Sequence, residues 1–198
     1  MIRDLKSGQL LTARQLAERL ATAAYVLVGE QRNNPDHPAL QLWLLQALGD
    51  RRPQGSLLLE MLTPIQQARV DEIRASIRTS REPVDLRASL QWEPEWDWDV
   101  YGPVLRFAFA QPWALLSAGL DFSDPDVGLQ DIAQRLLDAP APAMLFADAT
   151  RIQGNADIAQ RLSDLGEKGQ VVVLRLACKG EQIEPDSADY VWYTAALT

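Results

Sequence analysis

The stretch VLVGEQRNNPDH, residues 26–37, constrains the fold more than any other part of the chain. Residues 25–28 are bulky and mostly β-branched or aromatic, a pattern that predicts a buried strand. Gly29 ends this apolar run, and the polar residues after it are typical of a loop. Asp36 can cap the helix that begins HPALQLWLLQAL. The pattern predicts a strand, a loop and a helix, with Glu30 at the strand's carboxyl end, where open α/β sheets bind ligands.

The same alternation of strand and helix continues to the end of the chain. Apolar runs predict further strands at residues 56–61, 112–120, 142–150, 170–178 and 189–197. Helices are predicted at residues 13–24, 36–48, 64–77, 82–90, 101–110, 123–139 and 155–169. This order predicts an α/β fold with a mainly parallel sheet, covered by helices on both faces. The last strand is expected at an edge or at the end of the sheet.

Local signals set where some of these helices begin and which side faces the core. Thr12 and Gln15 form a capping-box signal before the first helix. Pro103 limits the helix that ends near residue 110 to a start near Tyr101. The helix at residues 64–77 is expected to turn four apolar side chains inward: Ile65, Val70, Ile73 and Ile77.

Length and composition agree with one globular domain. The chain has 198 residues, of which 47% are hydrophobic and 23% charged. We expect a single α/β domain across residues 1–198, with a small helical and aromatic-rich cap at roughly residues 64–100. The formal net charge of −8 disfavours nucleic acid as a partner, because phosphate groups need a basic surface. The sequence has no run of about 18 apolar residues.

Cys178 is the only cysteine, so an internal disulfide and a thiolate metal cluster are both excluded. It lies in the apolar run of residues 171–178 and is expected to be a buried structural thiol.

Four segments, in this order, resemble the ChaN-like haem-binding lipoprotein family: VLVGEQRNNPDHPALQLWLLQAL, LLLEML, WEPEWDWDVYGPVLRFA and ADYVWYT. The likeness covers most of the chain. It implies an α/β domain with a smaller helical part, in an iron-regulated protein of the bacterial cell envelope that binds haem. The family is in turn similar to the Tiki proteases and the erythromycin esterases, which use histidines and glutamates at the strand ends.

The motifs of this family are only partly present. Its first motif reads Gly-Glu-x-His, then Asp-Asn-Pro and a pair of histidines; the positions that fit are Gly29, Glu30, Asn34, Pro35 and His37. Arg32 stands at the first histidine position, Asn33 replaces the aspartate and Pro38 replaces the last histidine. The second motif, Gly-Asn-Gly-His, corresponds to residues 147–150, where the histidine is missing. The chain therefore resembles a degenerate member.

Charged residues are expected to meet at the carboxyl ends of the parallel strands. The acids are Glu30, Glu60 and Asp148, and the bases near them are Arg32 and Arg151. Three carboxylates can hold a hard cation such as Mg²⁺ or Ca²⁺. Alternatively, the two arginines form ion pairs with the acids and lock an ancestral site shut, which is the interpretation we favour. Because His37 is the only histidine, a metal-dependent hydrolase is the weakest interpretation.

The resemblance also implies a haem site, with an iron ligand and cations for the propionates. Tyr101 is the candidate ligand, because tyrosinate can bind haem iron. Candidate walls are Trp92, Trp96 and Trp98, and candidate propionate partners are Arg32, Arg106 and Arg151. The residues assigned to haem binding are Tyr101, His37, Arg32, Arg151, Trp98 and Glu30. The alternative is that the tryptophans pack in the core or hold a loop to the sheet, and that Tyr101 bonds a buried carbonyl.

The sequence therefore favours two non-catalytic functions. The preferred one is haem binding in bacterial haem or iron uptake. The alternative is a cofactor-free member that binds a protein partner or forms a homodimer through the patch at residues 92–101. By the resemblance, the protein is expected in the cell envelope or periplasm, with peripheral membrane association where a lipidated precursor exists. The first residues lack the apolar core of a secretory signal, so a cytoplasmic location is expected if Met1 is the native start.

Overall fold

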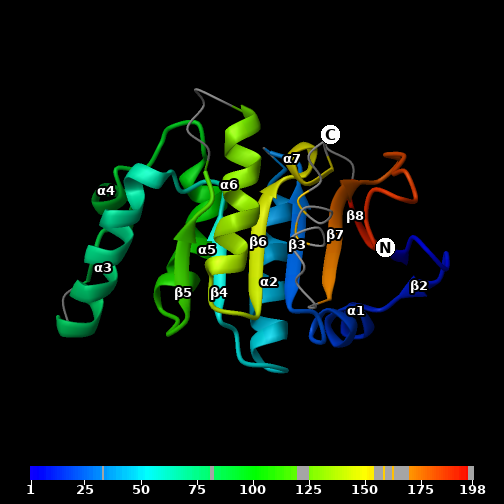
Figure 1. Cartoon of the computed structure of the whole chain (residues 1–198), viewed down its shortest axis with the longest axis horizontal. Coiled ribbons are helices and arrows are strands. Elements are labelled where there is room, and N and C mark those ends of the chain that lie inside the picture. Colours follow the sequence, from blue (N-terminus) through cyan, green and yellow to red (C-terminus); the bar gives the residue numbers. More distant parts are fainter. Residues whose placement is uncertain are drawn as a thin grey trace.

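The computed structural model describes residues 1–32, 34–80, 83–119, 125–153, 158, 162 and 170–195. These residues form an eight-stranded sheet in the order β2-β1-β8-β7-β3-β6-β4-β5 (Figure 1). The parallel strands are β3 (Tyr25–Glu30), β4 (Ser56–Leu59), β5 (Ala114–Ser117), β6 (Ala143–Asp148), β7 (Val171–Cys178) and β8 (Tyr190–Thr194). Two short antiparallel strands, β1 (Ile2–Asp4) and β2 (Leu10–Leu11), extend the sheet beyond β8.

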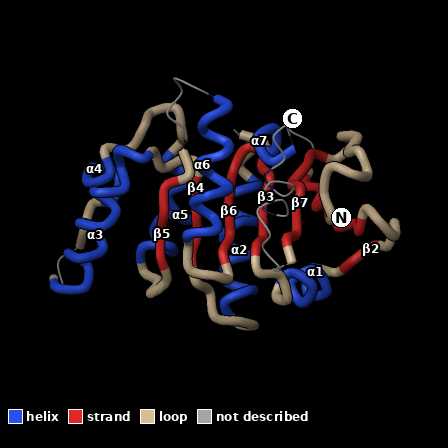
Figure 2. Tube along the Cα trace, viewed as in Figure 1, coloured by secondary structure: helices blue, strands red, loops and turns tan. Residues whose placement is uncertain are grey.

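Helices cover both faces of this sheet (Figure 2). One face carries α1 (Ala13–Leu20), α2 (Asp36–Gly49) and α5 (Trp98–Phe109), and the other carries α6 (Pro125–Asp138) and α7 (Ala149–Gln153). The strands alternate accordingly: Val26 and Val28 belong to the first core, and Leu27 to the second. The predicted α/β class, with a mainly parallel sheet, is confirmed.

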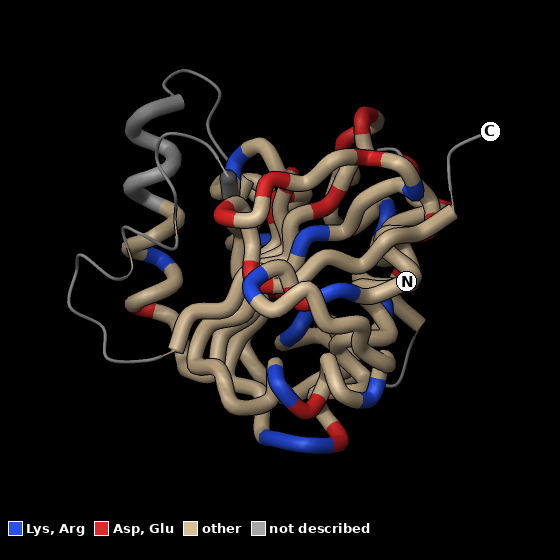
Figure 3. The backbone as a smooth tube through the Cα atoms, turned by 90° about the vertical axis from the view of Figure 1, so that its right-hand side faces the viewer, with Lys and Arg blue, Asp and Glu red and all other residues tan. Residues whose placement is uncertain are grey.

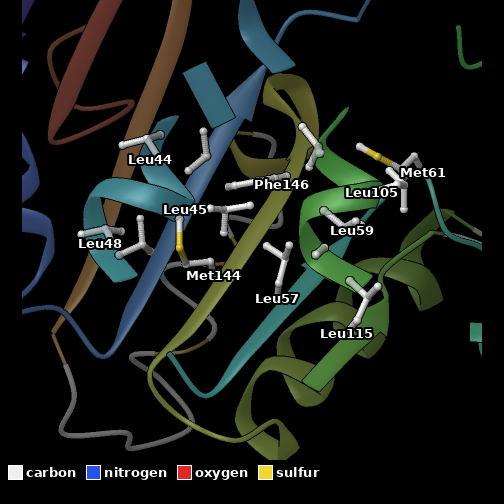
Figure 4. Packing of buried hydrophobic residues seen from close by; sticks show 14 of the residues in the cluster. Leu44, Leu45, Leu48, Leu57, Leu59, Met61, Leu105, Leu115, Met144 and Phe146 are labelled. Atoms are coloured by element: carbon white, nitrogen blue, oxygen red, sulfur yellow. The ribbon is translucent and has the colours of Figure 1, made fainter. Parts of the chain in front are cut away.

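The larger core lies between the sheet and the α2–α5 layer. Leu57 and Leu59 from β4 and Phe146 from β6 share this buried cluster with Leu44 of α2 and Leu105 of α5 (Figure 4). All five side chains have no exposed surface. This packing fixes where β3, β4 and β6 end, and so fixes the positions of the charged residues at those ends.

The predicted place of the last strand was wrong. β8 lies between β1 and β7, because the amino-terminal residues pair with it: Tyr193 N donates to Met1 O, and Ile2 faces Trp192. β1 and β2 have three and two residues, too short for their sequence to show a strand period.

The segment predicted as a cap contains a 3₁₀ turn (Pro64–Gln66), α3 (Gln67–Thr79) and α4 (Leu86–Leu90), which lie beyond β5 at one end of the sheet (Figure 1). The Gln67 side chain covers the edge of β5: Ser117 N donates to its Oε1 at 2.7 Å, and its Nε2 donates to Leu115 O at 3.2 Å. Two of the four side chains expected inside are exposed. Ile65 is 85% exposed and Ile77 37%.

One helix start and one cap also differ from the sequence prediction. α5 begins at Trp98, because Asp97 caps its first turn by accepting from Asp99 N at 2.9 Å, and Pro103 is tolerated inside the helix. Asp36 lies within the first turn of α2 and does not cap it. Of the helix predicted at residues 155–169, only two residues are described, Ile158 and Leu162, and both are buried. Among the described residues, no helix is long and apolar enough to cross a membrane.

Candidate functional site

The acids expected to meet at one rim of the sheet lie at adjacent strand ends. Glu30 ends β3 and faces Asp148 at the end of β6, while Glu60 directly follows β4 on the other side of β6. Gly29 allows α7 to approach β3, since a Cβ there would lie 3.1 Å from the Cα of Ala149. This close approach brings Arg151 of α7 over the rim.

Glu30 is buried and accepts hydrogen bonds from uncharged side chains. Its residue surface is 1% exposed, Gln41 Nε2 donates to its Oε2 at 2.8 Å, and Tyr101 Oη donates to its Oε1 at 3.3 Å. Burial, and then the negative charge of Glu60, raise the pKa of Glu30 to about 8. The carboxyl group is therefore mostly protonated at neutral pH.

Glu60 is equally buried but surrounded by cations. Arg151 Nε lies 2.5 Å from its Oε1 and Arg32 NH2 lies 3.7 Å from the same atom, while Asp148 N donates to its Oε2 at 2.5 Å. Asp148 itself caps α7 by accepting from Thr150 N at 2.9 Å. The interpretation that both arginines pair with a strand-end acid is confirmed for Glu60. Within the described ranges, no group of three or more His, Cys, Asp or Glu side chains is arranged to hold a metal ion.

Three side chains are stacked above Glu30. The guanidinium of Arg32 lies 4.2 Å from the ring centroid of Trp96, and Trp96 meets Tyr101 edge-on at 5.2 Å. Trp96 and Tyr101 are 7% and 1% exposed. The phenol of Tyr101 thus lies one layer below the surface, and its hydroxyl donates to the buried carboxyl group of Glu30.

The other two tryptophans of this segment pack against each other and against α5. Trp92 and Trp98 meet edge-on at 5.2 Å, and Arg106 lies 5.8 Å over the Trp98 ring. Trp92 Nε1 also donates to Trp96 O at 2.6 Å. These contacts hold the loop of residues 91–97 in place. This is the packing role that the sequence offered as the alternative to a haem wall.

His37 lies in a separate, neutral cluster near the end of β7. Its side chain is fully buried, Gln31 N donates to its Nδ1 at 2.9 Å, and its Nε2 lies 3.0 Å from Asn34 Nδ2. Burial, and then the positive charge of Arg175, lower the pKa of His37 to about 4. Both ring nitrogens face protein groups, so in this arrangement the imidazole is not presented to a ligand.

The expectation that Cys178 is fully buried was wrong. It is half-buried at the last position of β7, where its Sγ donates to Gln31 Oε1 at 3.1 Å and accepts from Asn34 Nδ2 at 3.4 Å. The strand ends there, so less of the core covers this side chain.

A cavity of about 350 Å³ opens between the strand ends, the 3₁₀ turn and the loop of residues 91–97. We call it the Arg32–Arg69 cavity; its walls include Arg32, Glu60, Ile65, Arg69, Trp96 and Gly119. Arg69 was not predicted as a site residue. Gln41 was not predicted either, although a polar residue one helical turn after His37 in an otherwise apolar helix is a recognisable signal of a buried hydrogen bond.

The family model described as "Haem-binding uptake, Tiki superfamily, ChaN" matches residues 16–127, more than half of the chain. The chain belongs to this ChaN family. Its fold is similar to a solved structure described as "Cofacial heme binding to ChaN of Campylobacter jejuni", with a TM-score of 0.80 and 17% sequence identity over 96% of this chain and 94% of that one. A comparison with curated proteins gave no significant match.

The Arg32–Arg69 cavity of this ChaN-family protein fits only part of a haem. Trp96 and Ile65 offer apolar contact, and Arg32 and Arg69 offer positive charge for carboxylates. However, none of the described residues that line it is a His, Tyr, Cys or Met that could bind iron. Tyr101 is the nearest assigned ligand and lies behind Trp96. In this arrangement the lining does not fit an iron-ligated haem.

Proposed function

We propose that this protein is a non-enzymatic haem-binding protein of bacterial haem or iron uptake that works at the cell envelope. The observation that carries the proposal is the family match, which spans Glu30, Arg32, Glu60, Trp96 and Tyr101. The solved ChaN structure with the same fold is described as binding haem, which supports the proposal. A non-enzymatic role is favoured because Glu30 and His37, whose pKa values are strongly shifted, are buried and do not line the cavity.

Tyr101 is the proposed iron ligand. Its hydroxyl is held by Glu30, and Trp96 with Arg32 stacked on it lies between the phenol and the cavity. Ligation of iron by Tyr101 therefore requires Trp96 and Arg32 to move aside. The same movement would free Arg32 to meet a propionate.

A haemin titration followed through the Soret band tests this proposal. The protein is expected to give a saturable, sharpened band that weakens in Tyr101→Phe. Tyr193→Phe is the matched control, because Tyr193 is half-buried on β8 and does not line the cavity. A featureless spectral shift of the kind produced by nonspecific uptake, or equal spectra for the two variants, would overturn the assignment.

A second candidate is a cofactor-free member that binds a protein partner or a second copy of itself. The observation in its favour is the closed rim, in which Glu60 pairs with Arg151 and Arg32, and Tyr101 is buried. This candidate predicts that the protein stays colourless with haemin. Light scattering of the purified protein, at several concentrations, would show whether a homodimer forms.

A further inference from the structure

We propose that the Arg32–Arg69 cavity binds a small apolar monocarboxylate, a ligand class distinct from haem. The cavity of about 350 Å³ is near the lower end of ligand pockets, which run from about 300 to 1,000 Å³. Its size suits a small molecule. The proposal concerns the cavity as it stands and does not depend on any movement of Trp96.

The apolar part of such a ligand is matched by an unusually exposed side chain. Ile65 lines the cavity and is 85% exposed, although the described chain has few large apolar side chains so open to water. Its backbone is held in place, because Gln66 Oε1 accepts from Thr63 N at 2.9 Å across the start of the 3₁₀ turn. An apolar ligand between Ile65 and Trp96 would cover this surface.

The carboxylate is matched by two arginines with incomplete pairing. Arg69 is half-buried and forms no hydrogen bond or ion pair with the described residues. Arg32 Nε is buried and has no acceptor among them, and its nearest carboxylate, Glu60, already has Arg151 and Asp148 N as closer partners. A ligand carboxylate would supply the acceptor that both guanidinium groups lack.

Two further acids restrict the ligand to a single negative charge. Glu93 and Glu95 line the same cavity, and neither side chain has a hydrogen bond or ion pair with another described residue. A molecule with several carboxylates would place at least one of them near these side chains, where like charges repel. A monocarboxylate can keep its charge at the arginines.

Calorimetric titration with 4-phenylbutyrate and with its amide tests the proposal at pH 7. The two probes share one apolar body and differ in charge. The acid is expected to saturate one site per chain, and the amide to bind at least about tenfold more weakly, the size of one charge-assisted hydrogen bond. Equal affinities, or no saturable binding of the acid, would overturn the proposal.

Variants separate the two parts of the site. Arg69→Gln is expected to weaken binding of the acid about tenfold, whereas Arg78→Gln, an exposed position on the same helix outside the cavity, is expected to leave it unchanged. Ile65→Ser is expected to weaken acid and amide alike, because it removes apolar contact only. Equal affinities in Arg69→Gln and Arg78→Gln, or an unchanged affinity in Ile65→Ser, would place the ligand elsewhere.

Discussion

The ends of β3 and β4 show two ways of keeping a glutamate inside a protein. Glu30 and Glu60 lie on either side of β6 and are 1% and 5% exposed. Glu30 accepts hydrogen bonds from the uncharged side chains of Gln41 and Tyr101 and keeps its proton, with its pKa raised to about 8. Glu60 is held by Arg151 and Arg32. Burial alone therefore does not decide the charge of a strand-end carboxylate; the neighbouring side chains do.

The two glutamates are also coupled. The negative charge of Glu60 contributes to the raised pKa of Glu30. Because Arg151 and Arg32 stabilise the charge on Glu60, they indirectly disfavour a second negative charge on Glu30. Figure 3 shows acidic and basic residues interspersed along the described backbone. The contrast between the protonated Glu30 and the paired Glu60 can be tested by substitutions at each strand end separately.

The largest effect is expected at the β4 end. Arg151→Met removes the closer of the two described arginines beside the buried Glu60 and leaves Asp148 N and the more distant Arg32. Loss of one partner of a buried ion pair costs about 3 kcal/mol of the free energy of unfolding. Urea unfolding followed by circular dichroism measures this loss. Arg14→Met is the control, because the Arg14–Glu18 pair is exposed and its loss costs at most about 0.5 kcal/mol. If the two variants lost equal stability, the contrast between the strand ends would fail.

A smaller, pH-dependent effect is expected at the β3 end. Between pH 4.5, its ordinary pKa, and about pH 8, Glu30 is protonated in the folded protein and ionised in the unfolded chain, so stability falls as the pH rises. His37 has the opposite effect on stability between about pH 4 and pH 6.5, because its pKa is lowered in the folded protein. Above pH 6.5 Glu30 makes the larger contribution and only the last part of the His37 titration opposes it, so the free energy of unfolding is expected to fall by about 1 kcal/mol from there to pH 8.

Glu30→Gln isolates this contribution. The variant keeps a neutral side chain of the same shape, so its stability is expected to stay nearly level between pH 6.5 and 8, while the rise due to His37 at lower pH remains. Glu18→Gln, at an exposed position, should follow the parent profile. Urea midpoints measured across this range check the three curves. A Glu30→Gln profile as steep as that of the parent would mean that Glu30 is ionised in the folded protein.

The sequence predicted most of the fold because strands and helices longer than four residues leave a readable hydrophobic period. β3 and α2 were found for this reason. β1 was missed, and so β8 was placed at an edge, because which strand pairs with the chain's first residues depends on contacts distant in sequence. The exposure of Ile65 was missed for the same reason: periodicity shows which residues share a face, but not whether another element covers it.

The candidate site was predictable in its position but not in its chemistry. Parallel strands with acids at their ends have to bring those acids to one rim, and the pairing of Arg151 with Glu60 follows from charge. The proton on Glu30 could not be foreseen, because it depends on Gln41 and on the depth of burial, which only the packed structure defines. Tyr101 was predicted as the iron ligand, and its position beside Glu30 and behind Trp96 depends on the path of the loop of residues 91–97.

The smallest effect is expected from metal ions. Glu60 already has cationic partners and Glu30 keeps its proton, so equimolar Mn²⁺ or Zn²⁺ should change the melting temperature by less than about 1 °C. A metal present at about 100 times its dissociation constant would add about 2.7 kcal/mol, and such a gain raises the melting temperature of a chain this size by at least about 5 °C. The two outcomes are therefore well separated, with the metal-free, chelator-treated protein as the reference. A rise of several degrees in the parent would contradict the pairing of the rim by arginines. A rise seen in Arg151→Met alone would show that the guanidinium of Arg151 occupies the place of a cation beside Glu60.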